Sequence, residues 1–323
     1  MNIDKITAAA DRIRGHAVRT PLLSAPLLNE TAGRRIFVKA ECLQKTGSFK
    51  YRGARSATTA LEPDIRSRGV LAFSSGNHAQ GVALAARELG IPAVIVMPED
   101  APSLKIANTR AYGAEVVLYD REIESREDIG SALAEQRGLS LIKPFDNEEV
   151  IAGQGTTGLE IAAQAQELGI EKADVLVCCG GGGLTSGISL ALEAKAPHLR
   201  PRPVEPEGFD DVARSLAAGS IQSNKAMSGS ICDAIVTPAP GKMTFPIMQR
   251  LCGPGIVVSD DEAQRAMALA FSRLKLVLEP GGAVALAAAL FHSEGDRDVI
   301  AVATGGNVDV AVFQSALQAF GES

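Results

Sequence analysis

The sequence predicts an α/β fold with open, mostly parallel, twisted sheets, arranged as two domains of which the smaller is inserted into the larger. From residue 69 onward, short apolar runs alternate with helical patterns, which is typical of parallel strands covered by helices on both faces. The chain has 323 residues, a length that suits about two domains. Its 32 glycines and 4% aromatic residues suit closely packed helices and backbone loops that approach a ligand.

The first block of alternating elements lies between residues 70 and 142. We expect strands at 70–73, 93–97, 115–119 and 140–142, and helices at 79–89, 102–112 and 125–136. An amphipathic helix is expected before this block, because Ile3, Ile6 and Ile13 recur at helical spacing.

The pattern restarts after Phe145, with helices expected at 158–168 and 184–194 and strands at 175–179, 256–258 and 299–303. Ser259 and Glu262 form a capping box that begins a further helix. Residues 201–229 are the least regular and are expected on the surface. The N-terminal residues should join the C-terminal block, which predicts a large domain of residues 1–67 and 147–323 and a small domain of residues 68–146.

Composition excludes several classes of protein. The formal net charge is −6 and there is no basic stripe, which argues against a nucleic-acid partner. The longest nearly apolar stretch, near residues 283–291, is far shorter than a membrane span, and charges at Asp4 and Lys5 are unlike a secretory signal. The five cysteines show no zinc-ligand spacing and no disulfide framework, so a reducing cytoplasm is the simplest setting.

The strongest local motif is a run of four glycines after Cys179, between an apolar strand and a helix. This arrangement exposes backbone N–H groups at a helix N-terminus, which favours an anion such as phosphate. The motif is neither a Walker loop nor a GxGxxG fingerprint, and a flexible turn is the alternative.

Three other segments carry candidate chemistry. Lys50 lies in the segment Thr46–Ala54, where a lysine held in a dry cleft can form a Schiff base, although most lysines are simply on the surface. Residues 73–80, Phe-Ser-Ser-Gly-Asn-His-Ala-Gln, link a strand to a helix and suit a carboxylate, or else cap the helix. Residues 304–307, Thr-Gly-Gly-Asn, follow the last strand at the sheet edge where ligands bind.

In this order, the four motifs resemble the fold-type II pyridoxal-phosphate (PLP) enzymes, which have a tryptophan synthase β-like fold. More narrowly, the chain resembles the serine/threonine dehydratase and serine racemase family. The resemblance runs from about Arg19-Thr20-Pro21 to Asn307, and includes the segment 150–156 and Glu279-Pro280.

The resemblance implies a role for each cofactor-binding motif. Lys50 would form the Schiff base with PLP, and Phe49 would lie beneath the ring. Asn77 would bond to the ring hydroxyl, and Thr304 would face the pyridine nitrogen. The phosphate would be held by the backbone of Gly180, Gly181, Gly182, Gly183 and Leu184.

The implied reaction is α,β-elimination from a β-hydroxy amino acid (threonine, serine or 3-hydroxyaspartate), which gives a 2-oxo acid and ammonia. Lys50 would remove the α-proton. The substrate carboxylate would be received by Ser74, Ser75, Asn77 and His78, and Arg126 would close over it unless it is only a solvated helix-surface residue.

Other activities stay open. An amino-acid racemase with side dehydratase activity would use Ser75 as the acid/base opposite Lys50, whereas in a dehydratase Ser75 need only cap the helix and bind the carboxylate. A cysteine-synthase-like β-replacement enzyme is disfavoured, because its usual Thr-Ser-Gly-Asn-Thr-Gly segment reads Ser-Ser-Gly-Asn-His-Ala here. A non-catalytic amino-acid binding module is also possible, but it would not need Lys50.

The segment 205–211 resembles the family's divalent-cation loop, which implies Mg²⁺ or Ca²⁺ bound by Glu205, the backbone oxygen of Phe209, and Asp211. The alternative is a charged surface loop. Pro201 and Pro203 stand where the family has an apolar strand, so we expect an edge or irregular strand there. The segment 232–234 reads Cys-Asp-Ala in place of the usual Ala-Asp-Gly, which points to a different choice of substrate. The resemblance also implies a homodimer.

Overall fold

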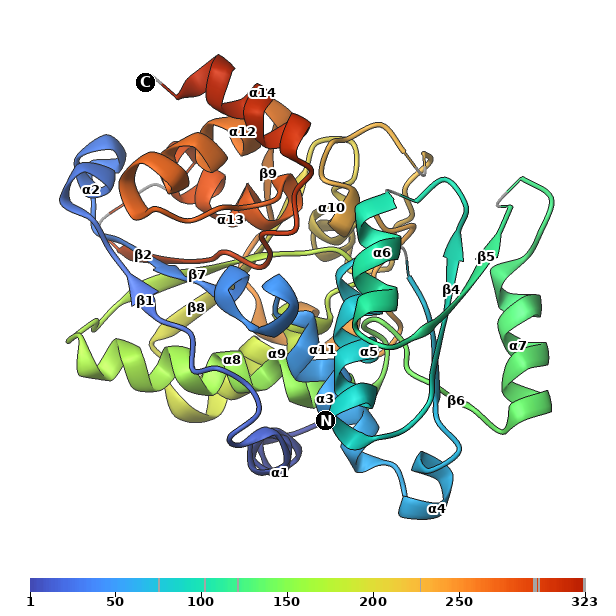
Figure 1. The fold of residues 1–323 in the computed structure, drawn as a ribbon. Helices are drawn as coiled ribbons and strands as arrows, with labels where there is room; N and C mark the ends of the chain where they lie inside the picture. The colour runs from blue at the N-terminus through green and yellow to red at the C-terminus, as the bar shows by residue number, and fades with distance from the viewer. Residues whose placement is uncertain are drawn as a thin grey trace.

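The computed structural model of the protein describes residues 1–74, 76–101, 103–120, 122–226, 228–292, 295 and 297–321. Within these residues the strands form two sheets (Figure 1). The larger sheet has, in spatial order, β1 (Leu22–Leu23), β2 (Ile36–Lys39), β10 (Asp298–Val302), β7 (Ala173–Cys178), β8 (Leu199–Pro206) and β9 (Ile256–Val258). The smaller sheet has β5 (Glu115–Tyr119), β4 (Ala93–Pro98), β3 (Val70–Phe73) and β6 (Ser140–Leu141).

The neighbouring strands of both sheets are parallel, apart from β1, which runs antiparallel to β2. The α/β class with mostly parallel sheets is therefore confirmed. The helices of the described residues are α1 (Ile3–Ile13), α2 (Pro26–Ala32), α3 (Lys50–Ala60), α4 (Pro63–Arg66), α5 (Asn77–Leu89), α6 (Ser103–Ala111), α7 (Arg126–Arg137), α8 (Glu148–Glu167), α9 (Gly183–Lys195), α10 (Asp211–Ala218), α11 (Thr244–Leu251), α12 (Asp260–Leu269), α13 (Pro280–Phe291) and α14 (Val310–Phe320). Short helical turns are η1 (Glu41–Leu43), η2 (Lys45–Gly47), η3 (Asp233–Ile235) and η4 (Ala270–Leu274).

Helices cover both faces of the larger sheet, as its apolar strands require. In Figure 1, α12, α13 and α14 lie on one side of it, and α8 and α9 lie on the other. Strands β2 and β7 are buried along their whole length, which places the core on both faces of the sheet. In the smaller sheet, α5 and α7 both pack against β3 and β4. No helix in the described part of the chain is long and apolar enough to cross a membrane.

Helix α3, which begins at Lys50, is fixed from two sides. It packs against α8 on one side and α5 on the other. The approach to α8 is so close that a Cβ on Gly153 would lie 2.6 Å from the carbonyl oxygen of Arg52. The buried Arg52 guanidinium also bonds to the carboxylates of Glu41 (2.8 Å) and Glu160 (2.7 Å). These contacts give the lysine at the start of α3 a rigid support.

The N-terminal residues join the sheet of the C-terminal block, because β2 pairs with β10 along its length. The smaller sheet is built entirely from residues between 70 and 141. The domain boundaries at residues 67–68 and 146–147 stay a prediction.

For one helix, the predicted start lies later in the chain than the observed start. We expected it at residues 158–168, whereas α8 begins at Glu148. Asn147 caps this helix, since its Oδ1 accepts hydrogen bonds from the N–H groups of Glu149 and Val150, each 3.0 Å long. The glycines of the first turns disfavour a helix by propensity. Glycines occur in this helix nevertheless, because it packs so closely against α3 and α9 that larger side chains would not fit.

The expectations for residues 201–229 were also wrong in part. These residues supply most of β8 and all of α10, and β8 lies between β7 and β9, so it is not an edge strand. The short strand β9 pairs only with Val204–Pro206 of β8. The Pro201 carbonyl oxygen accepts a hydrogen bond from the N–H of Gly253 (2.9 Å), so the backbone polar positions of Pro201 point to the β9 side of the strand. Those of Pro203, two residues later, point to the same side. The two prolines therefore lack N–H donors only at positions that β9 does not reach. The hydrogen bonds between β8 and β7 are kept.

Candidate active site

A pocket of about 340 Å³ lies where the two sheets meet, beyond the carboxyl ends of β3, β7 and β10. In open α/β sheets this is the edge at which ligands bind. Of the residues that we predicted for the cofactor and the substrate, those that line it are Phe49, Lys50, Ser74, Asn77, His78, Arg126, Gly180, Gly181, Gly182, Gly183, Leu184 and Thr304. Ser75 lies outside the described residues.

The segment that carries Lys50 is held by the segment after β10. Ser48 forms a bridge with Gly305, the N–H of Phe49 donates to the carbonyl oxygen of Thr304 (3.1 Å), and Gly306 donates to Gly47 (2.9 Å). Two segments that lie far apart in the sequence are thereby joined beside the pocket.

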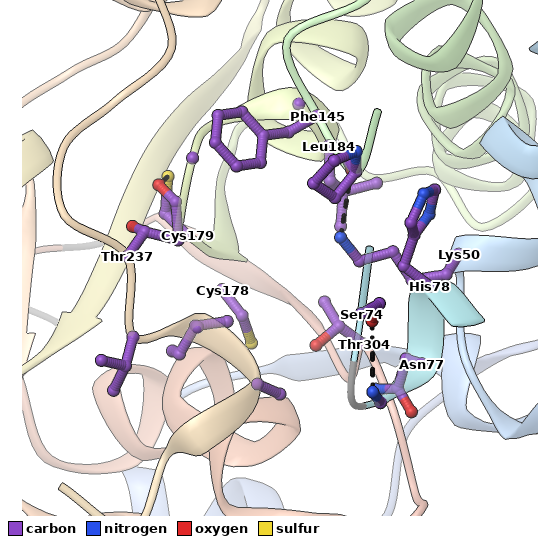
Figure 2. Close-up of a pocket in the computed structure, with 18 of the residues that line it drawn as sticks. Lys50, Ser74, Asn77, His78, Phe145, Cys178, Cys179, Leu184, Thr237 and Thr304 are labelled. Carbon is purple, nitrogen blue, oxygen red and sulfur yellow. Dashed lines mark hydrogen bonds between the residues drawn. The ribbon is translucent and has the colours of Figure 1, made fainter. Parts of the chain in front are cut away.

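The Lys50 side chain reaches into the pocket between Leu184 and Thr304 (Figure 2). Its Nζ donates to the carbonyl oxygen of Pro144 (3.2 Å). Removal from water lowers the pKa of Lys50 to about 8, although the nearby Glu279 carboxylate acts in the opposite direction. A substantial fraction of this amine is therefore neutral, and nucleophilic, at mildly alkaline pH.

The four glycines form a bare backbone turn at the start of α9. Gly182 is the N-cap, with a φ of 86°, and no side chain caps the helix. Residues 183–185 therefore present uncapped N–H groups beside the pocket, at the positive end of the helix dipole. Gly181 has no room for a side chain, because a Cβ there would lie 2.4 Å from the Phe145 ring. The turn fits a phosphate group.

A second uncapped helix N-terminus faces the same pocket. Helix α5 begins at Asn77, and its N-cap residue is Gly76. The Ser74 hydroxyl accepts a hydrogen bond from the N–H of Gly76 (3.1 Å), which closes the turn before the helix. Burial, and next the charge of Lys50, lower the pKa of His78 to about 3, so its ring is neutral. The His78 ring donates from Nε2 to the carbonyl oxygen of Ile142 (2.8 Å), and its buried Nδ1 has no partner among the described residues.

Glu279 and Asn307 form a polar network with Asn77, and their contacts could not be read from the sequence. Asn77 Nδ2 donates to Glu279 Oε1 (2.5 Å), and Asn307 Nδ2 donates to Asn77 Oδ1 (2.8 Å). Burial raises the pKa of Glu279 to about 7, although the hydrogen bond from Asn77 and the charges of Lys105 and Lys50 lower it. The sequence showed Glu279 and Asn307 only as parts of motifs.

Sequence reasoning also missed Lys105 and Phe145, which line the pocket. Lys105 Nζ forms an ion pair with Asp233 Oδ2 (2.9 Å), which links α6 beside the smaller sheet to η3 beside the larger one. Burial lowers the pKa of Lys105, but the Asp233 carboxylate, together with the charges of Glu279 and Asp309, raises it, and the net pKa is raised. A lysine in the first turn of a helix opposes the helix dipole, and this signal could have marked it.

Arg126 lies at the start of α7, where its side chain is 53% exposed. Its Nε donates to the Glu127 carboxylate (2.8 Å). It therefore lines the pocket with a guanidinium already held by a neighbouring carboxylate.

The residues predicted to hold a divalent cation lie apart from the pocket lining. Glu205 accepts hydrogen bonds from the N–H groups of Val212 (2.9 Å) and Ala213 (2.7 Å). Asp211 Oδ1 accepts from Asn224 (2.6 Å), while its buried Oδ2 has no partner among the described residues. Within the described residues, no group of three or more His, Cys, Asp or Glu side chains is arranged to hold a metal ion.

Comparison with known proteins agrees with this geometry. A family model described as "Pyridoxal-phosphate dependent enzyme" matches residues 13–305. The chain is 44% identical to L-threo-3-hydroxyaspartate ammonia-lyase of Pseudomonas sp, over 97% of each chain.

Among solved structures, a threonine deaminase from T.th. superimposes with a TM-score of 0.90 and 46% identity, covering 96% of this chain and 99% of that one. Serine racemase of maize superimposes with a TM-score of 0.91 and 38% identity, covering 98% and 97% of the two chains. The sequence, the fold and the paired helix N-termini around a buried lysine all lead to one assignment: this chain belongs to the family of pyridoxal-phosphate-dependent enzymes.

Proposed function

We propose that the protein is a PLP-dependent ammonia-lyase that converts a β-hydroxy amino acid to a 2-oxo acid and ammonia. One observation carries the proposal: a lysine with a lowered pKa lies in a pocket with two uncapped helix N-termini. Threonine, serine and 3-hydroxyaspartate are the proposed substrates, because the related ammonia-lyase and deaminase act on two of them by name.

The residues present fit the cofactor. The glycine turn at the start of α9 presents uncapped N–H groups beside the pocket, and Lys50 provides an amine that lines the same pocket. When bound, PLP supplies an electron sink that stabilises negative charge at the α-carbon of the substrate. Phe49 and Thr304 line this pocket as well, and we propose that they contact the ring.

The chain's own residues then bind the substrate and move its protons. The N–H groups at the start of α5, together with Ser74, suit the substrate carboxylate. The neutral fraction of Lys50 can accept a proton from the α-carbon, because its pKa lies close to working pH. His78 is neutral and cannot form an ion pair with the carboxylate, so its ring supplies at most a hydrogen bond.

The test is a substrate panel with the PLP-loaded protein. Release of 2-oxo acid is followed for L- and D-serine, L- and D-threonine and the diastereomers of 3-hydroxyaspartate, and the enantiomers that remain are separated. We expect 2-oxo acid from at least one of them. We also expect a visible absorbance band that disappears in Lys50→Ala and persists in Lys5→Ala, whose ion-paired lysine lies outside the pocket lining. A protein that binds no PLP would refute the proposal.

A racemase with side dehydratase activity is the second candidate. It is supported by the 38% identity to maize serine racemase, and the sequence has a serine at position 75, two residues before Asn77. Racemisation faster than 2-oxo acid release would favour it. Loss of racemisation, but not of elimination, in Ser75→Ala would assign Ser75 as its acid/base.

We further propose that Mg²⁺ or Ca²⁺ binds at Glu205, the Phe209 carbonyl and Asp211. Burial, and next the charge of Asp211, raise the pKa of Glu205 well above its ordinary value, and burial raises the pKa of Asp211 to about 6. A cation would relieve this repulsion, and Asp211 Oδ2, which has no hydrogen-bond partner among the described residues, could bind it. Raised thermal stability in millimolar Mg²⁺ or Ca²⁺, absent in Asp211→Asn, would support the site. Equal stability with and without the ions would refute it.

Homodimer assembly and a cytoplasmic location are also proposals. The location is supported by the cysteines, all of which carry free thiols. Light scattering of the purified protein would test the dimer, which a monomeric mass would exclude.

A further inference from the structure

Three side chains form a hydrogen-bonded chain that begins in the pocket lining and ends outside it: Glu279, Asn77 and Asn307. Asn77 donates from Nδ2 to Glu279 and accepts at Oδ1 from Asn307. Asn307 Nδ2 makes a second bond, to the carbonyl oxygen of Thr46 (2.7 Å). Asn77 and Glu279 line the pocket, but Asn307 is not among the lining residues.

The partners of Asn77 allow only one orientation of its amide. In the opposite orientation, the Asn77 oxygen would face the carboxylate oxygen of Glu279, and its NH₂ would face the NH₂ of Asn307. An asparagine NH₂ carries two hydrogens, of which Glu279 takes one. Asn77 therefore keeps one N–H donor for a ligand in the pocket that it lines.

Asn307 also braces the turn that leads to Lys50. Thr46 has a φ of 61°, a left-handed conformation that is uncommon outside glycine. At the next residue, Gly47, a Cβ would lie 2.6 Å from Asn307 Oδ1. Asn307 is thus packed directly against this turn while it bonds to the carbonyl oxygen of Thr46.

We propose that Asn307 is a positioning residue, which sets the amide orientation of Asn77 and braces the turn before Lys50. One amide group thereby aligns two functional groups that come from different helices, α5 and α3. The inference rests on the proposed function, since both of those groups are assigned to the cofactor.

The test compares wild type with Asn307→Ala and with Asn307→Asp, which keeps the shape but loses both N–H donors. Asn29→Ala is the matched control, because Asn29 is also a half-buried asparagine, bonded to Ser24 and Ile36 away from the pocket. The readouts are the dissociation constant for PLP, the position of the bound-cofactor absorbance band, and the melting temperature of the apoprotein.

Both Asn307 variants should bind PLP about tenfold more weakly or worse, because two hydrogen bonds of ordinary strength are lost. The absorbance band should shift, and kcat should fall with little change in KM. Asn29→Ala should lower the melting temperature and leave PLP affinity unchanged. Wild-type PLP affinity and spectrum in Asn307→Asp would overturn the inference alone, whereas a wild-type protein that binds no PLP would overturn the proposed function as well.

Discussion

Replacing Lys50 by methionine should make the apoprotein more stable, even though it removes the residue on which catalysis depends. Methionine has a similar length and no charge to desolvate. Burial lowers the pKa of Lys50 from 10.5 to about 8, which means that the folded protein holds this proton less firmly than the unfolded chain does. The charged lysine is therefore a destabilising feature of the folded state.

The size of the effect follows from this shift. A difference of roughly 2.5 pKa units corresponds to about 3 kcal/mol of free energy of unfolding. Losing the bond from Nζ to the carbonyl of Pro144 offsets about 1 kcal/mol. The attraction to Glu279 is already contained in this net shift. Water that reaches the pocket reduces the gain further, so we expect Lys50→Met to add about 1–2 kcal/mol at pH 7.

The pH dependence separates this reasoning from a simple packing effect. Below pH 8 the lysine is charged in both states, and the full penalty is present. The penalty declines as pH rises from 8 toward 10.5, because the unfolded chain alone then keeps the proton. Urea unfolding of both apoproteins at pH 7 and at pH 10 measures the difference. A variant that is less stable at pH 7, or equally stabilised at both pH values, would refute the reasoning.

Three more predictions concern other parts of the structure. Gly181→Ala places a Cβ 2.4 Å from the Phe145 ring and should lower the free energy of unfolding, measured in urea, by about 1–3 kcal/mol. PLP should also bind more weakly in a titration; unchanged PLP affinity would contradict the proposal that the glycine turn holds the phosphate. Lys105→Met and Asp233→Asn each break the 2.9 Å ion pair across the pocket. The Asp233 side chain is 61% exposed, so a double-mutant cycle on stability should give a coupling free energy of only about 0.5 kcal/mol. A coupling of several kcal/mol would show that water does not screen this ion pair. Ser259→Ala removes the cap of α12 and should lower the free energy of unfolding by about 1 kcal/mol with normal kcat; full stability would show that the cap is dispensable.

The parts of the site that belong to one strand–loop–helix junction could be predicted from the sequence. The glycine turn before α9, the turn before α5 and Thr304 after β10 each follow an apolar run, and parallel strands bring their carboxyl ends to one sheet edge. The resemblance then suggested a role for Lys50, which no local pattern distinguishes from a surface lysine. In the structure these residues line one pocket, while their roles stay a prediction.

Contacts between distant segments could not be predicted, because they depend on how elements pack. Lys105 and Asp233 are 128 residues apart and meet only where α6 faces η3. Asn307 reaches Asn77 across 230 residues, and its amide orientation depends on partners that the sequence does not bring together. A polar side chain among predicted turns therefore indicates a site, but its donor and acceptor roles require the fold.

The strand β8 shows that a local rule can fail for a local reason. Proline lacks the N–H that a sheet requires, and two prolines in one strand argue for an edge. Proline at alternate positions, however, removes donors from one side of the strand only. Pro201 and Pro203 lose them on the side where the short β9 leaves room. The third proline of β8, Pro206, lies beyond Val204, the last residue that pairs with β7, so this pairing is kept. The spacing of Pro201 and Pro203 is thus more informative than the number of prolines. Because β8 stays within the sheet, the proposed cation loop begins at the buried end of this strand.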